Sequence, residues 1–216
     1  MTSVRLAYDA GLRRWLKGPA TARGSHKGLV NDRGCPYLHP VISFGKVVLR
    51  GMVREDVPFL HDWDARQIWP EISTRPWTPG LLADALKDFD EGKRGRGDDR
   101  HVPFTVIADG TCVGQVTLWG IDAHNRRAHL GIVLGPEHRG RGYGSDACRA
   151  LLEYAFIDRG LNRVQLEVLA DNDAAIRAYH AAGFAVEGRL RESAWVRGRF
   201  ADEIVMSVLA PVRSET

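Results

Sequence analysis

The stretch Pro136-Glu-His-Arg-Gly-Arg-Gly-Tyr-Gly-Ser-Asp-Ala-Cys-Arg-Ala-Leu-Leu-Glu-Tyr154 sets the expectation for the whole chain. It follows an apolar run, Leu130 to Leu134, that is typical of a buried strand. Three glycines at alternate positions separate this run from a helical pattern that begins near Ser145. The first N–H groups of a helix lack internal partners, and the helix dipole favours negative charge beside them. The stretch therefore predicts a site for a phosphate-bearing ligand.

The segments around this stretch predict a mixed sheet with helices on its faces. Asp109-Gly110 between two apolar runs is a strong hairpin signal. The order is strand, two helices, three strands, then helix, strand, helix and two strands, which is neither regular β–α alternation nor an all-β pattern. We therefore expect an α/β (α+β) fold with a central sheet of about seven strands. The expected strands are 46–53, 103–108, 112–119, 127–134, 163–169, 185–196 and 202–209, and the expected helices begin near residues 54, 80, 145 and 174.

The chain divides into a basic N-terminal extension, residues 1–45, and one domain, residues 46–210. Residues 1–40 hold seven Lys or Arg against two Asp, and glycines and prolines follow a short helical pattern at Val4 to Leu16. We expect the extension to be a mobile segment, an arm that packs on a partner subunit, or a cover over the active site.

Composition narrows the class of protein. Lys and Arg number 30 against 27 Asp and Glu, so the formal charge of +3 is no footprint of nucleic-acid binding. No apolar run approaches the roughly 18 residues that span a membrane. The three cysteines lack metal-like spacing, and the eight histidines show no H-x-x-x-H or H-E-x-x-H pattern. A cytoplasmic protein without a metal is expected.

The glycines do not fit two common phosphate-binding patterns. No Gly-Lys-Ser or Gly-Lys-Thr is present, as a P-loop requires. The spacing of Gly140, Gly142 and Gly144 misplaces the third glycine of a dinucleotide fingerprint. Glu167 lies near where a ribose-binding acid belongs, but most of the sheet precedes this loop, whereas that fingerprint normally opens its domain.

Two longer motifs point to another ligand. They are Arg139-x-x-Gly142-x-Gly144 and Asn172-x-x-Ala175-x-x-x-Tyr179-x-x-x-Gly183-Phe184. In this order and spacing they resemble the coenzyme A loop and the following motif of the GNAT superfamily of acetyl-CoA-dependent N-acetyltransferases. Segments 187–192 and 197–200 are similar to its branch of ribosomal-protein, polyamine and antibiotic acetyltransferases. The resemblance covers about Lys46 to Leu209.

The resemblance implies where acetyl-CoA binds. The sheet would be mostly antiparallel, with a parallel strand pair, 127–134 and 163–169, that splays apart around the cofactor. Asn172 could contact the cofactor, cap the following helix, or do both. The cofactor-binding residues carried over are Ile132, Val133 and Leu134 through their backbone, Arg139, Gly140, Arg141, Gly142, Tyr143 and Gly144 through loop amides, and Asn172 and Tyr179.

The resemblance also implies direct attack of a primary amine on the thioester in a ternary complex. Tyr179 matches the family's general acid, and a phenol with a pKa near 10 can donate a proton to a departing thiolate with a pKa of about 8.5. An amine is mostly protonated at neutral pH, so a base is also needed. Glu167 is the first choice, because a charged residue within an apolar strand is expected to face a cleft. His129 and a water chain are the alternatives.

The sequence leaves the acceptor amine open among a protein N-terminus, a polyamine, an amino acid and an aminoglycoside-like antibiotic. Aromatics with nearby carboxylates suit a cationic amine, although each tryptophan could also belong to the core. A homodimer is a further arrangement to expect. The alternative function is a non-catalytic acyl-CoA-sensing or interaction module on the same fold. The substrate-binding candidates are Trp63, Trp69, Trp77 and Glu71, with Trp119 and Trp195 as further members of the set.

Overall fold

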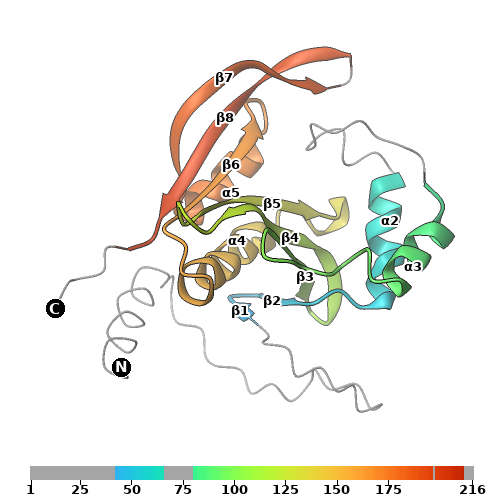
Figure 1. The fold of residues 1–216 in the computed structure, drawn as a ribbon. Coiled ribbons are helices and arrows are strands. Elements are labelled where there is room, and N and C mark those ends of the chain that lie inside the picture. The colour runs from blue at the N-terminus through green and yellow to red at the C-terminus, as the bar shows by residue number, and fades with distance from the viewer. Residues whose placement is uncertain (1–41, 66–79, 197, 212–216) are drawn as a thin grey trace, which may run out of the picture.

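The computed structural model describes residues 42–65, 80–196 and 198–211 (Figure 1). The helix expected at Val4–Leu16 lies outside these residues, as do Trp69, Glu71 and Trp77. The strands are β1 (Ile42–Phe44), β2 (Val47–Arg50), β3 (His101–Ala108), β4 (Thr111–Asp122), β5 (Arg127–Leu134), β6 (Arg163–Leu169), β7 (Ala185–Val196) and β8 (Arg199–Leu209). The α-helices of the described part are α2 (Val57–Ala65), α3 (Leu82–Asp90), α4 (Tyr143–Glu153) and α5 (Asp173–Ala181).

The eight strands form one sheet in the order β1-β2-β3-β4-β5-β6-β8-β7. Every neighbouring pair is antiparallel except β5 and β6, which are parallel. This confirms the expected mixed sheet with a single parallel pair. The sequence predicted about seven strands, and the additional one is β1, which pairs Ile42 with Leu49. Because β1 has only three residues, it carries too short a pattern to be recognised among the glycines and prolines of segment 1–45.

Side chains of the first half of the sheet enter two separate cores, because successive residues of a strand point to opposite faces. Val47 and Leu49 face the larger core, which is built around α4. Val48 and Ile107 face a smaller core with Leu60 and Trp63 of α2. The sheet is therefore covered by α4 on one face and by α2 on the other.

Helix α4 is the centre of the larger core. Its side chains Ala147, Cys148, Leu151 and Leu152 have no measurable exposure. Each leucine buried in this way contributes about 1.5–3 kcal/mol relative to an exposed one. The α-helical part ends at Glu153, and a single π-helical turn, Tyr154–Asp158, completes the helix that the sequence predicted as far as Gly160.

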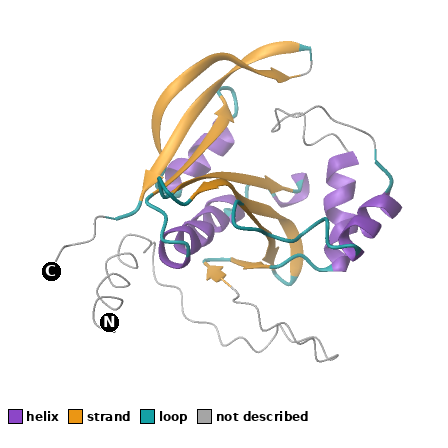
Figure 2. Cartoon of the chain, viewed as in Figure 1, coloured by secondary structure: helices purple, strands orange, loops and turns teal. Residues whose placement is uncertain are grey.

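The hairpin of β7 and β8 extends beyond the body of the molecule (Figure 2). β7 is the edge strand of the sheet and is mostly exposed. Near the tip, Trp195 and Phe200 pack edge to face at 4.8 Å and remain exposed. No helix in the part of the chain that the structure describes is both long and apolar enough to cross a membrane.

Candidate active site

The candidate site lies where the two parallel strands separate. β5 and β6 pair at Arg127–Arg163, Ala128–Val164 and His129–Gln165, and their pairing stops there. β5 stays bonded to β4 as far as Leu134, and β6 stays bonded to β8 as far as Leu169. The facing edges beyond His129 and Gln165 therefore carry backbone groups that a ligand can pair with. Ile132, Val133 and Leu134 lie on one of these edges, and their contacts with a cofactor stay a prediction.

The glycine loop follows the end of β5 and leads into α4. Gly140 and Gly142 have φ values of 75° and 86°, in the left-handed region that favours glycine. A Cβ added at either position would meet nothing within 4 Å, so the loop surface is open rather than packed. The loop thus presents backbone amides at the start of α4, an arrangement that fits a pyrophosphate.

The loop is held from the side by the turn between β1 and β2, which the sequence reasoning missed. Lys46 donates from its backbone N–H to an Asp146 oxygen at 3.0 Å, and its Nζ donates to the carbonyl of Arg141 at 3.2 Å. A Cβ at Gly45 would lie 2.3 Å from an Asp146 oxygen, so the turn packs directly on the first turn of α4. These contacts join residues about 100 positions apart, and no local pattern signals them.

Trp63, expected to contact substrate, and Tyr143, expected to contact the cofactor through its amide, both have side chains packed inside the protein. Trp63 is 1% exposed, and its Nε1 donates to Glu137 at 3.1 Å. Its ring lies against Gly135, where a Cβ would come within 2.4 Å of it. Trp63 thus supports the start of the glycine loop, and its assignment as a substrate contact is wrong for this conformation. The Tyr143 ring is also buried and its hydroxyl donates to Asp109 at 3.0 Å, so only its backbone N–H is available to a cofactor.

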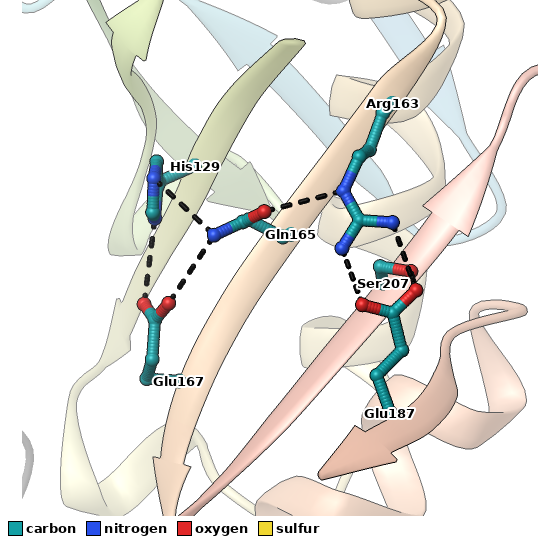
Figure 3. Close-up of polar contacts among 6 residues, drawn as sticks. All are labelled: His129, Arg163, Gln165, Glu167, Glu187 and Ser207. Carbon is teal, nitrogen blue, oxygen red and sulfur yellow. Dashed lines mark hydrogen bonds and ion pairs between the residues drawn. The ribbon is translucent and has the colours of Figure 1, made fainter. Parts of the chain in front are cut away.

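A polar cluster occupies the point where β5 and β6 diverge (Figure 3). His129 Nδ1 lies 3.4 Å from Glu167 Oε2, and Gln165 Nε2 lies 3.4 Å from both His129 Nε2 and Glu167 Oε1. Gln165 Oε1 accepts from Arg163 Nε at 3.2 Å. Arg163 also donates through both terminal nitrogens to Glu187. The structure thus brings together His129 and Glu167, the two candidate bases.

The charges of this cluster are set by its hydrogen bonds. The hydrogen bond from His129, with a further one from Gln165, holds the pKa of the Glu167 carboxyl below its usual range, although partial burial acts in the opposite direction. Hydrogen bonds from Arg163 and Ser207 lower the pKa of Glu187 to about 2. Both glutamates are therefore carboxylates at neutral pH.

Trp119 completes the cluster on its open side. Its ring stacks on His129 at 4.2 Å and is 42% exposed. Gly131, the next residue on the same face of β5, leaves room beside it, because a Cβ there would lie 3.2 Å from Thr117 and 3.7 Å from the Trp119 indole nitrogen. An exposed aromatic ring and a carboxylate therefore flank the same histidine, which suits a cationic amine.

The remaining predicted residues lie on the loop after β6 and on α5. Asn172 accepts a hydrogen bond from the Ala175 N–H at 3.1 Å and so caps α5, while its cofactor contact stays a prediction. The Tyr179 ring packs edge to face on Phe184 and against the larger core, which includes Cys148. Burial raises the pKa of Tyr179, which keeps the phenol protonated.

Comparison with known proteins places these features in a family. A model of an acetyltransferase (GNAT) domain matches residues 46–185. Spermidine N(1)-acetyltransferase from Escherichia coli (strain K12) is 30% identical over 170 residues, 77% of this chain and 87% of that protein. The putative ribosomal N-acetyltransferase YdaF from Bacillus subtilis (strain 168) is 31% identical over 117 residues, 54% of this chain and 64% of that protein.

Solved structures of a third relative are also similar. Spermidine N-acetyltransferase from Vibrio cholerae, in complex with CoA and spermine, gives a TM-score of 0.68 at 25% identity, and the match covers 76% of this chain and 96% of that one. A dodecameric structure of the Vibrio cholerae enzyme gives a TM-score of 0.64 at 27% identity, covering 79% and 99% of the two chains.

Proposed function

Because the chain belongs to the GNAT acetyltransferase family and is an acetyl-CoA-dependent N-acetyltransferase, we propose that it acetylates a primary amine of a polyamine at the divergence of β5 and β6. The observation that carries this proposal is the placement of exposed Trp119 and ionised Glu167 on either side of His129. An ammonium group beside both would gain a cation–π contact of about 0.5–2 kcal/mol and an ion pair. The names of the spermidine-acetylating relatives support a polyamine over the other candidate amines.

On the donor side, we assign the binding of acetyl-CoA to the glycine loop and the free edge of β5. The amides of residues 139–144 and the start of α4 would hold the pyrophosphate, and the backbone of 132–134 would pair with the amides of the pantetheine arm. Bound there, the cofactor supplies a thioester whose carbonyl carbon accepts the amine nitrogen while its carbon–sulfur bond breaks. Asn172, at the end of the loop after β6, would add a side-chain contact.

On the acceptor side, Glu167 orients the amine. Its carboxylate keeps lone pairs beyond those that His129 and Gln165 occupy, because each oxygen accepts more than one hydrogen bond. These can hold an ammonium group, relay to water the proton that the nitrogen loses before it attacks, and accept the second proton once the carbon–nitrogen bond has formed. Trp119 would contact the methylene chain of the amine as well as its charge.

Tyr179 would donate a hydrogen bond to the departing sulfur. The raised pKa keeps its phenol protonated, but makes complete transfer to a thiolate with a pKa of about 8.5 unfavourable. The phenol therefore stabilises the developing negative charge, and the proton released by the amine balances the thiolate. This role uses the protonated form that burial enforces.

The test is release of free thiol from acetyl-CoA with spermidine, spermine, an amino acid, an N-terminal peptide and an aminoglycoside as acceptors. We expect the highest kcat/KM with a polyamine. Glu167→Gln should lower that kcat/KM by about 100-fold or more, since it removes the proton-accepting and ion-pairing group. Glu91→Gln, which alters an exposed carboxylate paired with Lys93 at the end of α3, is the matched control and should leave kcat/KM unchanged.

Two other outcomes of this assay would contradict the proposed function. Turnover of the peptide alone would contradict a polyamine acceptor and favour a protein N-terminus. Binding of acetyl-CoA without turnover of any amine would favour an acyl-CoA-sensing module.

A further inference from the structure

Arg163, Gln165 and Glu167 form one polar row along β6. They occupy alternate positions, whereas Val164, Leu166 and Val168 between them point into the larger core. His129 on β5 pairs in register with Gln165, and it is the last residue to do so before the strands separate. The row therefore contains one candidate base, Glu167, and contacts the other, His129 (Figure 3).

The orientation of the Gln165 amide follows from its neighbour. A guanidinium has only donors, and Arg163 Nε points at Gln165 from 3.2 Å. The amide oxygen must face Arg163 to accept this hydrogen bond. The amide NH2 group, which can only donate, then faces His129 Nε2 and Glu167 Oε1.

The orientation of Arg163 is fixed in turn by β7 and β8. Glu187 of β7 accepts from both terminal nitrogens of Arg163, a fork that holds the guanidinium plane. Ser207 of β8 donates to the same carboxylate at 2.5 Å. The row is thus anchored by β8, the neighbour of β6 on the side away from β5, and by β7 beyond it.

We propose that Arg163 and Gln165 are positioning residues that set the tautomer of His129, with its proton on Nδ1 and donated to Glu167. His129 Nε2 has to accept from the Gln165 NH2 group, because a proton on Nε2 would point at another donor. The proton then belongs on Nδ1, which lies 3.4 Å from a Glu167 oxygen. In this arrangement the lone pair on Nε2 of the neutral imidazole is occupied by the hydrogen bond from Gln165.

This tautomer has a consequence for catalysis, which rests on the proposed function: it decides whether His129 or Glu167 can act as the base. A His129 whose lone pair accepts from Gln165 does not take a proton from the amine. Glu167, which accepts from both neighbours, stays an oriented carboxylate with lone pairs to spare. Glu167 is therefore the residue that meets the amine, and His129 holds it in place.

The tautomer can be read without any turnover. Long-range ¹H–¹⁵N correlation spectra of the full chain, labelled in its eight histidines, distinguish an Nδ1–H from an Nε2–H imidazole, and His129→Gln identifies the signal. We expect the Nδ1–H pattern for His129 in the wild-type protein. In Gln165→Met and Arg163→Met we expect a mixture with the Nε2–H form. An Nε2–H pattern in the wild type, or no change in either variant, would overturn the proposal.

Kinetics with acetyl-CoA and spermidine give the second reading. Gln165→Met should lower kcat by about 10-fold and leave the KM for acetyl-CoA unchanged. The effect on kcat should be smaller than that of Glu167→Gln, because Gln165 only positions the group that accepts the proton. Arg189→Met is the matched control, because it removes the 2.7 Å ion pair with Asp202, which lies outside the row. If no amine is turned over, the proposed function fails while the spectra still decide the tautomer. If amines are turned over but the tautomer is the other one, only this inference fails.

Discussion

Glu167 is a better ligand for an ammonium ion than a base strong enough to deprotonate one outright. Its pKa lies below the usual glutamate value of about 4.3, whereas an alkyl ammonium resembles lysine at about 10.4. Complete proton transfer between them would cost at least about 8 kcal/mol. An ammonium nitrogen has no lone pair, so its first proton must pass on to water before the carbon–nitrogen bond forms. Glu167 then accepts the second proton, which becomes far more acidic once that bond exists.

Tyr179→Phe tests the phenol at the same scale. We expect kcat to fall by about 100-fold at saturating substrates, because the departing sulfur loses its hydrogen-bond donor while the ring and its packing on Phe184 remain. The raised pKa of Tyr179 means that the wild-type kcat should show no alkaline loss from this group up to about pH 9. Tyr154→Phe is the control, because that ring packs on Phe104 in the core. Unchanged turnover of Tyr179→Phe at saturation would remove the tyrosine from the mechanism.

The two tryptophans show what a single residue's sequence context can and cannot predict. Trp63 stands between Asp62 and Asp64, and Trp119 stands between Leu118 and Gly120, so the immediate neighbours favour exposure for the ring that is in fact buried. Trp63 is buried because α2 packs on the second face of the sheet, where Gly135 leaves room for its ring. Trp119 stays 42% exposed, and its ring stacks on His129 instead of entering either core. The orientation of Glu167 could be predicted from the strand alone. It alternates with Leu166 and Val168, which face the core, so its side chain points to the opposite face.

At the scale of elements, the glycine loop is supported by segments that its own sequence does not contain. The turn before β2 packs on the first turn of α4 through Lys46 and Gly45, and the ring of Trp63 from α2 packs under Gly135. The strand–loop–helix pattern could be predicted because each part has a local signal. The contacts made by the turn before β2 and by Trp63 could not be predicted, because a contact between residues far apart in sequence produces no hydrophobic periodicity in either segment.

Gly142→Ala tests the loop itself. The left-handed backbone at Gly142 would cost an alanine about 1–2 kcal/mol, so the loop should shift and its amides should lose their alignment. We expect the KM for acetyl-CoA to rise by about 10-fold with little change in the KM for the amine. Gly51→Ala is the matched control, because that glycine has no positive φ and a Cβ there would meet nothing within 4 Å. An equal KM for acetyl-CoA in the two variants would contradict the role given to the loop.

At the scale of the whole molecule, the active-site gap is a consequence of topology. β5 ends in the loop that starts α4, and β6 is carried away from β5 by its full pairing with β8. The order of elements allowed a mixed sheet to be predicted, but not that the parallel pair would share only three residue pairs. The number of residue pairs between β5 and β6 depends on the direction that β6 takes when it pairs with β8. That direction is set by contacts between distant segments, which no local sequence pattern records.

The ion pair between Arg163 and Glu187 links β6 to β7 across β8, so its removal should be visible in the stability of the whole domain. Glu187 has a pKa of about 2 when folded and about 4.3 when unfolded, so its contribution is complete above the higher value and disappears as the pH falls through the lower one. Because both side chains of the pair are partly exposed, we expect Glu187→Gln to lower the free energy of unfolding by only about 0.5–1 kcal/mol at neutral pH. Urea unfolding of both proteins from about pH 6 to about pH 2.5 should show this difference shrinking toward zero. Arg163→Met should remove the same energy without adding to the effect of Glu187→Gln. A difference that stays constant down to the lowest pH would show that Glu187 stabilises the hairpin by packing rather than by charge.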